Sequence, residues 1–378
     1  MIKKCICFIL ILTLLLFSLT GCYDSSGIED FYYIVAMGID KAENNLIKIS
    51  IQTAKTSSTS DSSTTQSSDY KIYSVDATSI DSGISILNNY LNKKINLSHC
   101  SAIIFSEEIA RSGLKSIVNL LGNDTEIRPN CNIIISSKKA YDVLNKVSNS
   151  GENFSSRLYE YILNSVDYTG YTIDSTFNSF FSGINNLEAQ ATAIYTIVND
   201  DTIQNSGMAI FRDDVMIGTL SPLQTIAHQI LTNNLDSCMI TIDSPFHEGD
   251  SIDLNLKRIK SPKFDINIVN NTPVITINAY LQATVDSSGA NFDYTKEENI
   301  EKIENAADEY LKSLLEEYLY ITSKNYNCDI VGFGGIASSK YLTADEFNKI
   351  HWNEVFKDSL FDVNINTTIT SSHLFNKE

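Results

Sequence analysis

The sequence comprises 378 residues, and its 46 acidic against 28 basic residues give a formal net charge of −18 at pH 7. Phosphate backbones repel such a charge, so nucleic acid is excluded as an expected partner. Hydrophobic residues make up 43% of the chain, which excludes general disorder and is enough for a sizeable core.

The N-terminus has the layout of a bacterial export signal. Two lysines precede an apolar run from Cys5 to Leu19, shorter than the roughly 20 residues of a membrane-spanning helix. Leu19-Thr20-Gly21-Cys22 follows at once and resembles the lipobox of bacterial lipoproteins. We therefore predict that residues 1–21 are a signal peptide and that Cys22 receives an S-diacylglyceryl group, with N-acylation as a further option. An ordinary cleaved signal with an incidental Cys22 is the alternative.

Lipidation at Cys22 would fix the location of the protein. Two acyl chains hold a protein stably on a membrane, so the sequence predicts an extracytoplasmic body anchored to the outer leaflet. Loss of Lys3 and Lys4 with the signal changes the charge from −18 to −20 (−18 minus 2), and anionic headgroups repel that charge. The acyl chains, rather than the net surface charge, are expected to hold the protein on the membrane.

Residues 22–190 alternate strands with helices, which is typical of an α+β region. Residues 31–39 and 46–52 flank a turn at Asn44-Asn45 and predict a hairpin. Residues 55–69 contain no apolar side chain and predict a disordered Ser/Thr loop. The further predicted elements are strands at 70–75, 102–105 and 132–135, helices at 80–91, 107–111, 114–121 and 138–147, and a linker at 149–186 with a helix around 154–163.

Residues 191–378 form the second predicted α+β region. Strands are expected at 191–198, 207–211 and 215–220, and a helix that opens at Ser221-Pro222 follows them. Four alternating segments, at 239–242, 252–256, 264–268 and 274–281, predict an antiparallel sheet; a helix at 295–325 and a strand at 361–369 complete the chain. We expect several mixed or antiparallel sheets, each covered by helices, in three subdomains with a second boundary near residue 245.

The remaining cysteines, Cys100, Cys131, Cys238 and Cys328, are widely spaced and form no C-x-x-C pair. The spacing indicates neither a disulfide framework nor a zinc site. Cys100 and Cys131 each begin an apolar run, so a bridge between neighbouring strands is one hypothesis and buried free thiols are the favoured one.

No enzyme signature emerges from the other polar residues, and we predict no cofactor or metal. The glycines of Gly332-Phe333-Gly334-Gly335 lack the spacing and helix of a dinucleotide site, and indicate a turn or close packing. The histidines show no metal-ligand spacing, and the acidic pairs are typical of solvated faces; these residues are His99, His228, His247, His351, His373, Glu107-Glu108, Asp213-Asp214 and Glu316-Glu317. Tyrosine clusters at Tyr32-Tyr33, Tyr159 and Tyr161, and Tyr168 to Tyr171 either line a groove or, as favoured, pack with a surface hydroxyl.

In order and spacing, the chain's motifs resemble the Ger(x)C family, the lipoprotein C subunits of nutrient receptors for spore germination. One departure is Tyr23, where the family often has Trp. The motifs are Cys22 to Glu29, Ile34-Val-Ala-Met-Gly-Ile-Asp-Lys41, His99 to Ile104, Glu107 to Arg111, Glu126-Ile-Arg128, Gly207-Met-Ala-Ile-Phe211, Gly218-Thr-Leu220, Asp329-Ile-Val-Gly-Phe-Gly334 and Trp352-Asn-Glu-Val-Phe356.

The resemblance implies a three-domain α+β body without catalysis, anchored to the outer leaflet of the spore inner membrane. There it would work with integral-membrane A and B subunits, so that nutrient binding by the complex triggers germination. Whether this subunit contacts the nutrient stays open. A solute-binding lipoprotein of a transporter, with two domains around a ligand cleft, is the alternative hypothesis.

Overall fold

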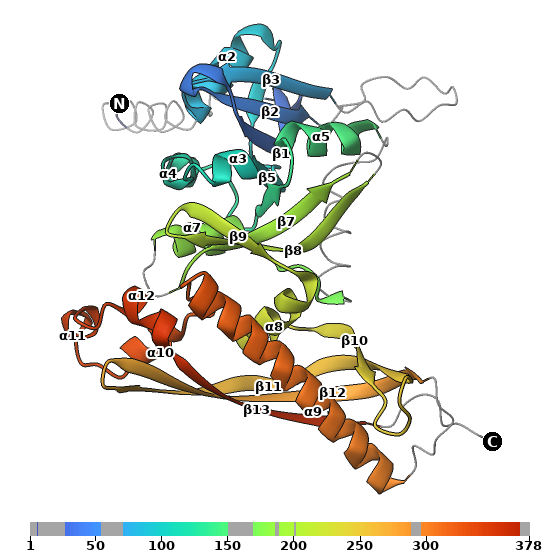
Figure 1. The fold of residues 1–378 in the computed structure, drawn as a ribbon. Coiled ribbons are helices and arrows are strands. Elements are labelled where there is room, and N and C mark those ends of the chain that lie inside the picture. Colours follow the sequence, from blue (N-terminus) through green and yellow to red (C-terminus); the bar gives the residue numbers. More distant parts are fainter. Residues whose placement is uncertain are drawn as a thin grey trace.

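The computed structural model describes Ile6 and residues 27–53, 71–149, 169–185, 189–199, 202–288 and 296–370. The predicted signal peptide, Cys22, the loop at 55–69 and the helix around 154–163 lie outside these residues and stay predictions. The fold is mixed, with two sheets and helices on both (Figure 1). The predicted α+β class is therefore confirmed.

The larger sheet has nine strands in the order β3-β2-β1-β5-β6-β7-β8-β9, with β4 beside β1. Its centre, from β1 to β7, is parallel, and the strands at both ends are antiparallel. The predicted hairpin is β1–β2, and Asn44 and Asn45 adopt positive φ at its turn. The bounds are β1 Phe31–Lys41, β2 Ile47–Thr53, β3 Lys71–Ala77, β4 Lys94–Asn96, β5 Ala102–Ser106, β6 Asn132–Ser136, β7 Thr192–Val198, β8 Ile203–Arg212 and β9 Val215–Leu220.

Both faces of this sheet are buried, which explains why its central strands are continuous apolar runs. Ile133 and Ile135 of β6 pack into one hydrophobic cluster, and Ile134 between them packs into the other. One face is covered by α2 (Ile80–Tyr90), α3 (Glu107–Ala110), α4 (Lys115–Asn123) and α7 (Phe177–Asn185), and the other by α5 (Ala140–Asn149). The sequence did not predict α7 or β4.

The smaller sheet has the order β10-β11-β12-β13. Its bounds are β10 Ser237–Asp243, β11 Ser251–Val269, β12 Thr272–Ser288 and β13 Leu360–Ile369. The prediction of separate strands at 252–256 and 264–268 was wrong, because β11 runs through both, with three irregularities in its register, two of which lie between the predicted strands. β10, β11 and β12 are antiparallel as predicted, but β13 is parallel to β12 because the chain crosses over through α9 (Glu297–Tyr320).

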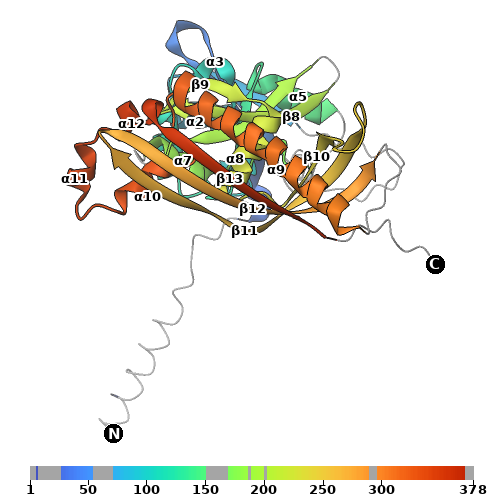
Figure 2. The ribbon, with the colours of Figure 1, turned by 60° about the horizontal axis from the view of Figure 1, so that its bottom comes forward.

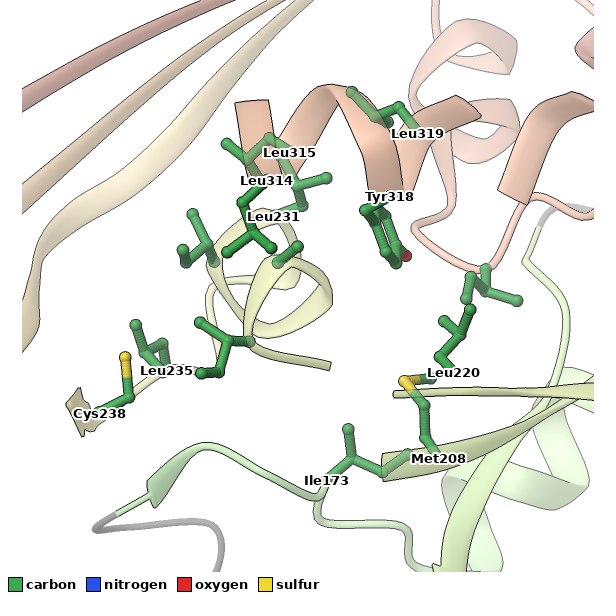
Figure 3. Packing of buried hydrophobic residues seen from close by; sticks show 14 of the residues in the cluster. Ile173, Met208, Leu220, Leu231, Leu235, Cys238, Leu314, Leu315, Tyr318 and Leu319 are labelled. Carbon is green, nitrogen blue, oxygen red and sulfur yellow. The ribbon is translucent and has the colours of Figure 1, made fainter. Parts of the chain in front are cut away.

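Helix α8 (Pro222–Thr232) lies between the two sheets (Figure 1). It begins with Ser221 as N-cap and a capping box with Gln224. Figure 3 shows Leu231 of α8 beside Leu314 and Leu315 of α9, with Met208 and Leu220 of the nine-stranded sheet across from them. One hydrophobic cluster therefore joins the two sheets. The boundaries near 190 and 245 and the three subdomains stay predictions.

Candidate functional site

Two carboxylates are buried at helix starts. Asp40, at the end of β1, accepts hydrogen bonds from the backbone N–H groups of Ala140 (2.7 Å) and Tyr141 (3.0 Å), at the start of α5. Burial raises the pKa of Asp40 although these bonds oppose the shift. The end of the Gly-Ile-Asp motif thus joins β1 to α5.

Asp329 occupies the corresponding position before α10 (Phe333–Ser338). It accepts from the backbone N–H groups of Gly332 (2.9 Å), Phe333 (3.1 Å) and Gly334 (2.7 Å), and from the Trp352 indole N–H (2.9 Å). Burial raises its pKa, against the effect of these four bonds. Asp329 therefore fixes the start of α10 and ties Trp352 to it.

The glycine cluster serves this arrangement. Gly332 has φ +88°, a conformation that favours glycine, so the predicted turn is confirmed there. The expectation that no helix follows the cluster was wrong, because α10 begins at Phe333. Its first N–H groups are already occupied by the Asp329 carboxylate, as an anion would occupy them. The sequence also did not predict α11 (Ala344–Asn348) or α12 (Trp352–Val355).

The histidines that the sequence analysis considered as metal ligands lie apart from one another in the described residues. His228 is buried, with its Nδ1 2.7 Å from the Tyr318 hydroxyl, and burial lowers its pKa to about 4. His99 packs edge-on against Tyr33, whereas His247 and His351 are exposed and His373 lies outside the described residues. In the described part of the chain, no three His, Cys, Asp or Glu side chains form a group that could hold a metal ion.

The four cysteines of the folded body are buried free thiols. Neighbouring parallel strands bring Cys100 and Cys131 together, since Ala102 pairs with Asn132. Contact with Cys100, then burial, raises the pKa of Cys131 well above its ordinary value. Cys100 and Cys131 therefore lie beside neighbouring strands, as expected, and both are buried free thiols, which was the favoured hypothesis, rather than a disulfide bridge.

A polar cavity of about 950 Å³ lies between the start of α7 and the end of α8. Carboxamides and hydroxyls dominate its wall, including Asn132, Asn178, Gln190, Gln229 and Thr232. The Gln229 Nε2 donates to the carbonyls of Gly170 (2.9 Å) and Thr172 (2.6 Å), which holds α8 against the segment before α7. The wall is suited to a small polar solute rather than to an apolar one.

A second cavity, of about 830 Å³, lies beside α11 and α12. Tyr341, Phe347 and Trp352 line it. The tyrosines singled out from sequence line neither cavity: Tyr32 packs beside Tyr73, Tyr33 contacts His99, and Tyr171 is exposed. Tyr159, Tyr161 and Tyr168 lie outside the described residues.

Among the helices that the structure describes, none is long and apolar enough to cross a membrane.

Comparison with known proteins identifies both halves of the chain. Residues 24–198 match the family "Spore germination protein N-terminal domain", and residues 206–373 match "Spore germination B3/GerAC like, C-terminal". Spore germination protein KC of Bacillus subtilis (strain 168) is 19% identical over 413 residues, covering 100% of this chain and 98% of that protein. Putative spore germination protein YfkR of the same strain is 22% identical over 385 residues, covering 94% and 93%.

The fold is shared with a solved structure, the crystal structure of the GerBC protein. The TM-score is 0.58 at 17% identity, over 88% of this chain and 96% of that one. With both family matches together spanning most of the sequence, the chain belongs to the GerAC family of spore germination proteins, the Ger(x)C family.

Proposed function

We propose that this protein is a non-catalytic, lipid-anchored subunit of a nutrient germinant receptor. The observation that carries the proposal is the match of both halves to spore germination families, with a relative aligned over the whole chain. The buried polar groups fit a structural role: Asp40 and Asp329 hold helix starts, and His228 pairs with Tyr318.

Membership in the C-subunit family suggests integral-membrane A and B subunits as partners. The lipobox-like sequence before Cys22 supports an acyl anchor in the outer leaflet of the cell or spore inner membrane, with the body extracytoplasmic. In such a complex, nutrient binding triggers germination, and this subunit is required for the response.

Labelled palmitate tests the anchor. We expect the wild type and Cys7→Ala to incorporate label, because Cys7 lies in the predicted signal, and Cys22→Ala to incorporate none. Label in Cys22→Ala, together with retention in the membrane fraction, would contradict lipidation at this position.

Deletion of the gene tests the receptor role. In a strain whose other receptors of this family are also deleted, the null mutant should lose its nutrient response, and the wild-type gene should restore it. A normal response of the null to every nutrient tried would contradict the proposal. Capture of the membrane complex should recover the A and B subunits.

The polar cavity favours one alternative, a solute-binding lipoprotein of a transporter. That role predicts measurable affinity of the isolated protein for a small polar solute by calorimetry, and capture of transporter components in place of A and B subunits. The two roles are therefore separated by the same pull-down.

A further inference from the structure

Two buried thiols lie side by side where the neighbouring strands β5 and β6 begin. The strands are parallel, and Ala102 pairs with Asn132. The backbone N–H of Asn132 also donates to the carbonyl of Ser101 (2.9 Å), so the pairing continues to the residue before. Ser101 therefore lies beside Cys131. Cys100 is displaced from Cys131 by one strand spacing and one residue along the chain.

This offset suits a disulfide bridge. A strand spacing of about 4.8 Å and a rise of about 3.3 Å per residue put the two Cα atoms roughly 5.8 Å apart. The Cα atoms of bridged cysteines usually lie about 4.4–6.8 Å apart, most often near 6 Å. The backbone therefore has little distance to move for the two sulfur atoms to bond.

Both side chains point into the same hydrophobic cluster. Cys131 continues the alternation of Ile133 and Ile135, and all three are buried there. Cys100 reaches this cluster from the turn before β5, in which its backbone N–H donates to the carbonyl of Leu97 (2.9 Å). Contact with Cys100 is the largest cause of the raised pKa of Cys131. The two thiols are thus neighbours in one apolar site.

The thiol pair lies one residue below the surface. Cys100 and Cys131 are 2% and 1% exposed, whereas His99 and Asn130, the residues directly before them, are exposed. Local opening at the ends of elements costs less free energy than unfolding of the whole domain. A small reagent can therefore reach one sulfur atom after local opening at this edge of the sheet.

The other two cysteines of the described body lie elsewhere. Cys238 and Cys328 belong to the cluster around α8, and the Cys328 Sγ donates to the carbonyl of Phe211 (3.0 Å). Figure 2 shows β10, which carries Cys238, on the smaller sheet and apart from α3, which follows β5. Oxidation of the folded chain should therefore spare Cys238 and Cys328.

We propose that Cys100 and Cys131 form an oxidation site, which a low-molecular-weight disulfide converts to an intramolecular bridge. One cysteine thiolate attacks the reagent disulfide and expels a small thiolate, and the second cysteine thiolate then attacks the mixed disulfide and expels the other. Two protein thiols and one reagent disulfide become one protein disulfide and two small thiols, which take up the two protons. The protein loses two electrons and the reagent gains them. This chemistry depends neither on an anchor at Cys22 nor on a receptor role.

The bridge closes a loop that contains β5, α3 and α4. A loop of this length restricts the unfolded chain, which lowers the equilibrium constant of unfolding roughly 100-fold. Folding and oxidation form one thermodynamic cycle, so the folded chain favours the bridge over the unfolded chain by the same factor. Oxidation thus locks the crossover between β5 and β6.

Disulfide mapping tests the site. The full chain is incubated with glutathione disulfide in native buffer, the remaining thiols are alkylated, and the peptides are identified by mass spectrometry. We expect one intramolecular bridge, between Cys100 and Cys131. Cys100→Ala and Cys131→Ala should each abolish it, whereas Cys238→Ala and Cys328→Ala, at thiols that are also buried, should leave it in place.

Mixtures of reduced and oxidised glutathione measure how strongly the fold favours the bridge. The value of [GSH]²/[GSSG] at which half the bridge is reduced should be roughly 100-fold higher in native buffer than in concentrated urea. This comparison uses the wild-type chain, so it needs no variant to fold. Equal values in the two conditions, unreacted Cys100 and Cys131 in native buffer, or a bridge to Cys238 or Cys328 would overturn the proposal.

Discussion

The Asp329 carboxylate accepts four hydrogen bonds, three of them buried and one partly buried, and its removal should be costly. We expect Asp329→Ala to lower the free energy of unfolding by about 3 kcal/mol, because three backbone N–H groups and the Trp352 indole lose their acceptor. Urea denaturation measures the change. The control Asp362→Ala, at an exposed position of β13, should stay within about 0.5 kcal/mol of wild type. Equal losses in the two variants would contradict the role of Asp329.

His228 should make stability depend on pH. Its pKa is about 4 in the folded chain against an ordinary value of 6.5, because burial disfavours the charged ring. As the pH falls, His228 therefore takes up a proton at a higher pH in the unfolded chain than in the folded chain. The contribution of neutral His228 to the free energy of unfolding is complete above pH 6.5 and is lost as the pH falls toward 4. At pH 5 the loss is about 2 kcal/mol relative to pH 7.

Urea denaturation of the wild type and of His228→Gln at both pH values checks this contribution. The difference between the two proteins should shrink as the pH falls, since glutamine does not titrate. The comparison removes the effect of Asp40 and Asp329, whose raised pKa values act in the opposite direction in both proteins. A constant difference from pH 7 to pH 5 would mean that His228 does not titrate in this way.

At the scale of single residues, the sequence located the special positions better than it explained them. The turn at Gly332 follows from glycine chemistry. The position of the Asp329 carboxylate at the start of α10 could not be predicted in the same way. Whether a bound anion or an internal carboxylate occupies a helix start depends on the path of the chain after the turn. The same holds for His228, whose partner Tyr318 is 90 residues away. The proposed site residue, Cys22, lies outside the described residues and remains a prediction.

At the scale of elements, α9 protects the outer edge of β13. Asp308 accepts from the backbone N–H of Thr367 and Glu304 from that of Ile369, both at 2.8 Å. Unpaired edge strands invite association with other chains. We expect Glu304→Ala with Asp308→Ala to lower stability by about 2 kcal/mol and to cause self-association. Light scattering and urea denaturation measure the two effects.

The matched control for this prediction is Glu301→Ala with Glu309→Ala, which removes the same charge from exposed positions of α9. It should leave the protein monodisperse and nearly as stable as wild type. If both double variants associate equally, loss of surface charge rather than edge exposure is the cause.

Most elements were predictable because periodicity records which side chains are buried. The failures occurred where burial is not periodic. Between Arg258 and Lys263 the alternation of β11 breaks, and Pro262 reads as a strand end, yet the register irregularities carry the strand through. The parallel placement of β13 was not predictable from its own residues, because it depends on the crossover through α9.

At the scale of the molecule, the continuous cluster around α8 should make the two sheets unfold together. Trp352, the single tryptophan, reports the C-terminal helices, and far-UV ellipticity reports the whole chain. We expect the urea transitions of the two signals to coincide.

Leu231→Ala, at a buried position of α8, should lower the urea midpoints of both signals together by an amount equivalent to about 3 kcal/mol. Leu223→Ala, 45% exposed on the same helix, should change them little. An ellipticity transition without a Trp352 change, or a shift of only one signal, would instead indicate independent domains of the kind that boundaries near 190 or 245 imply.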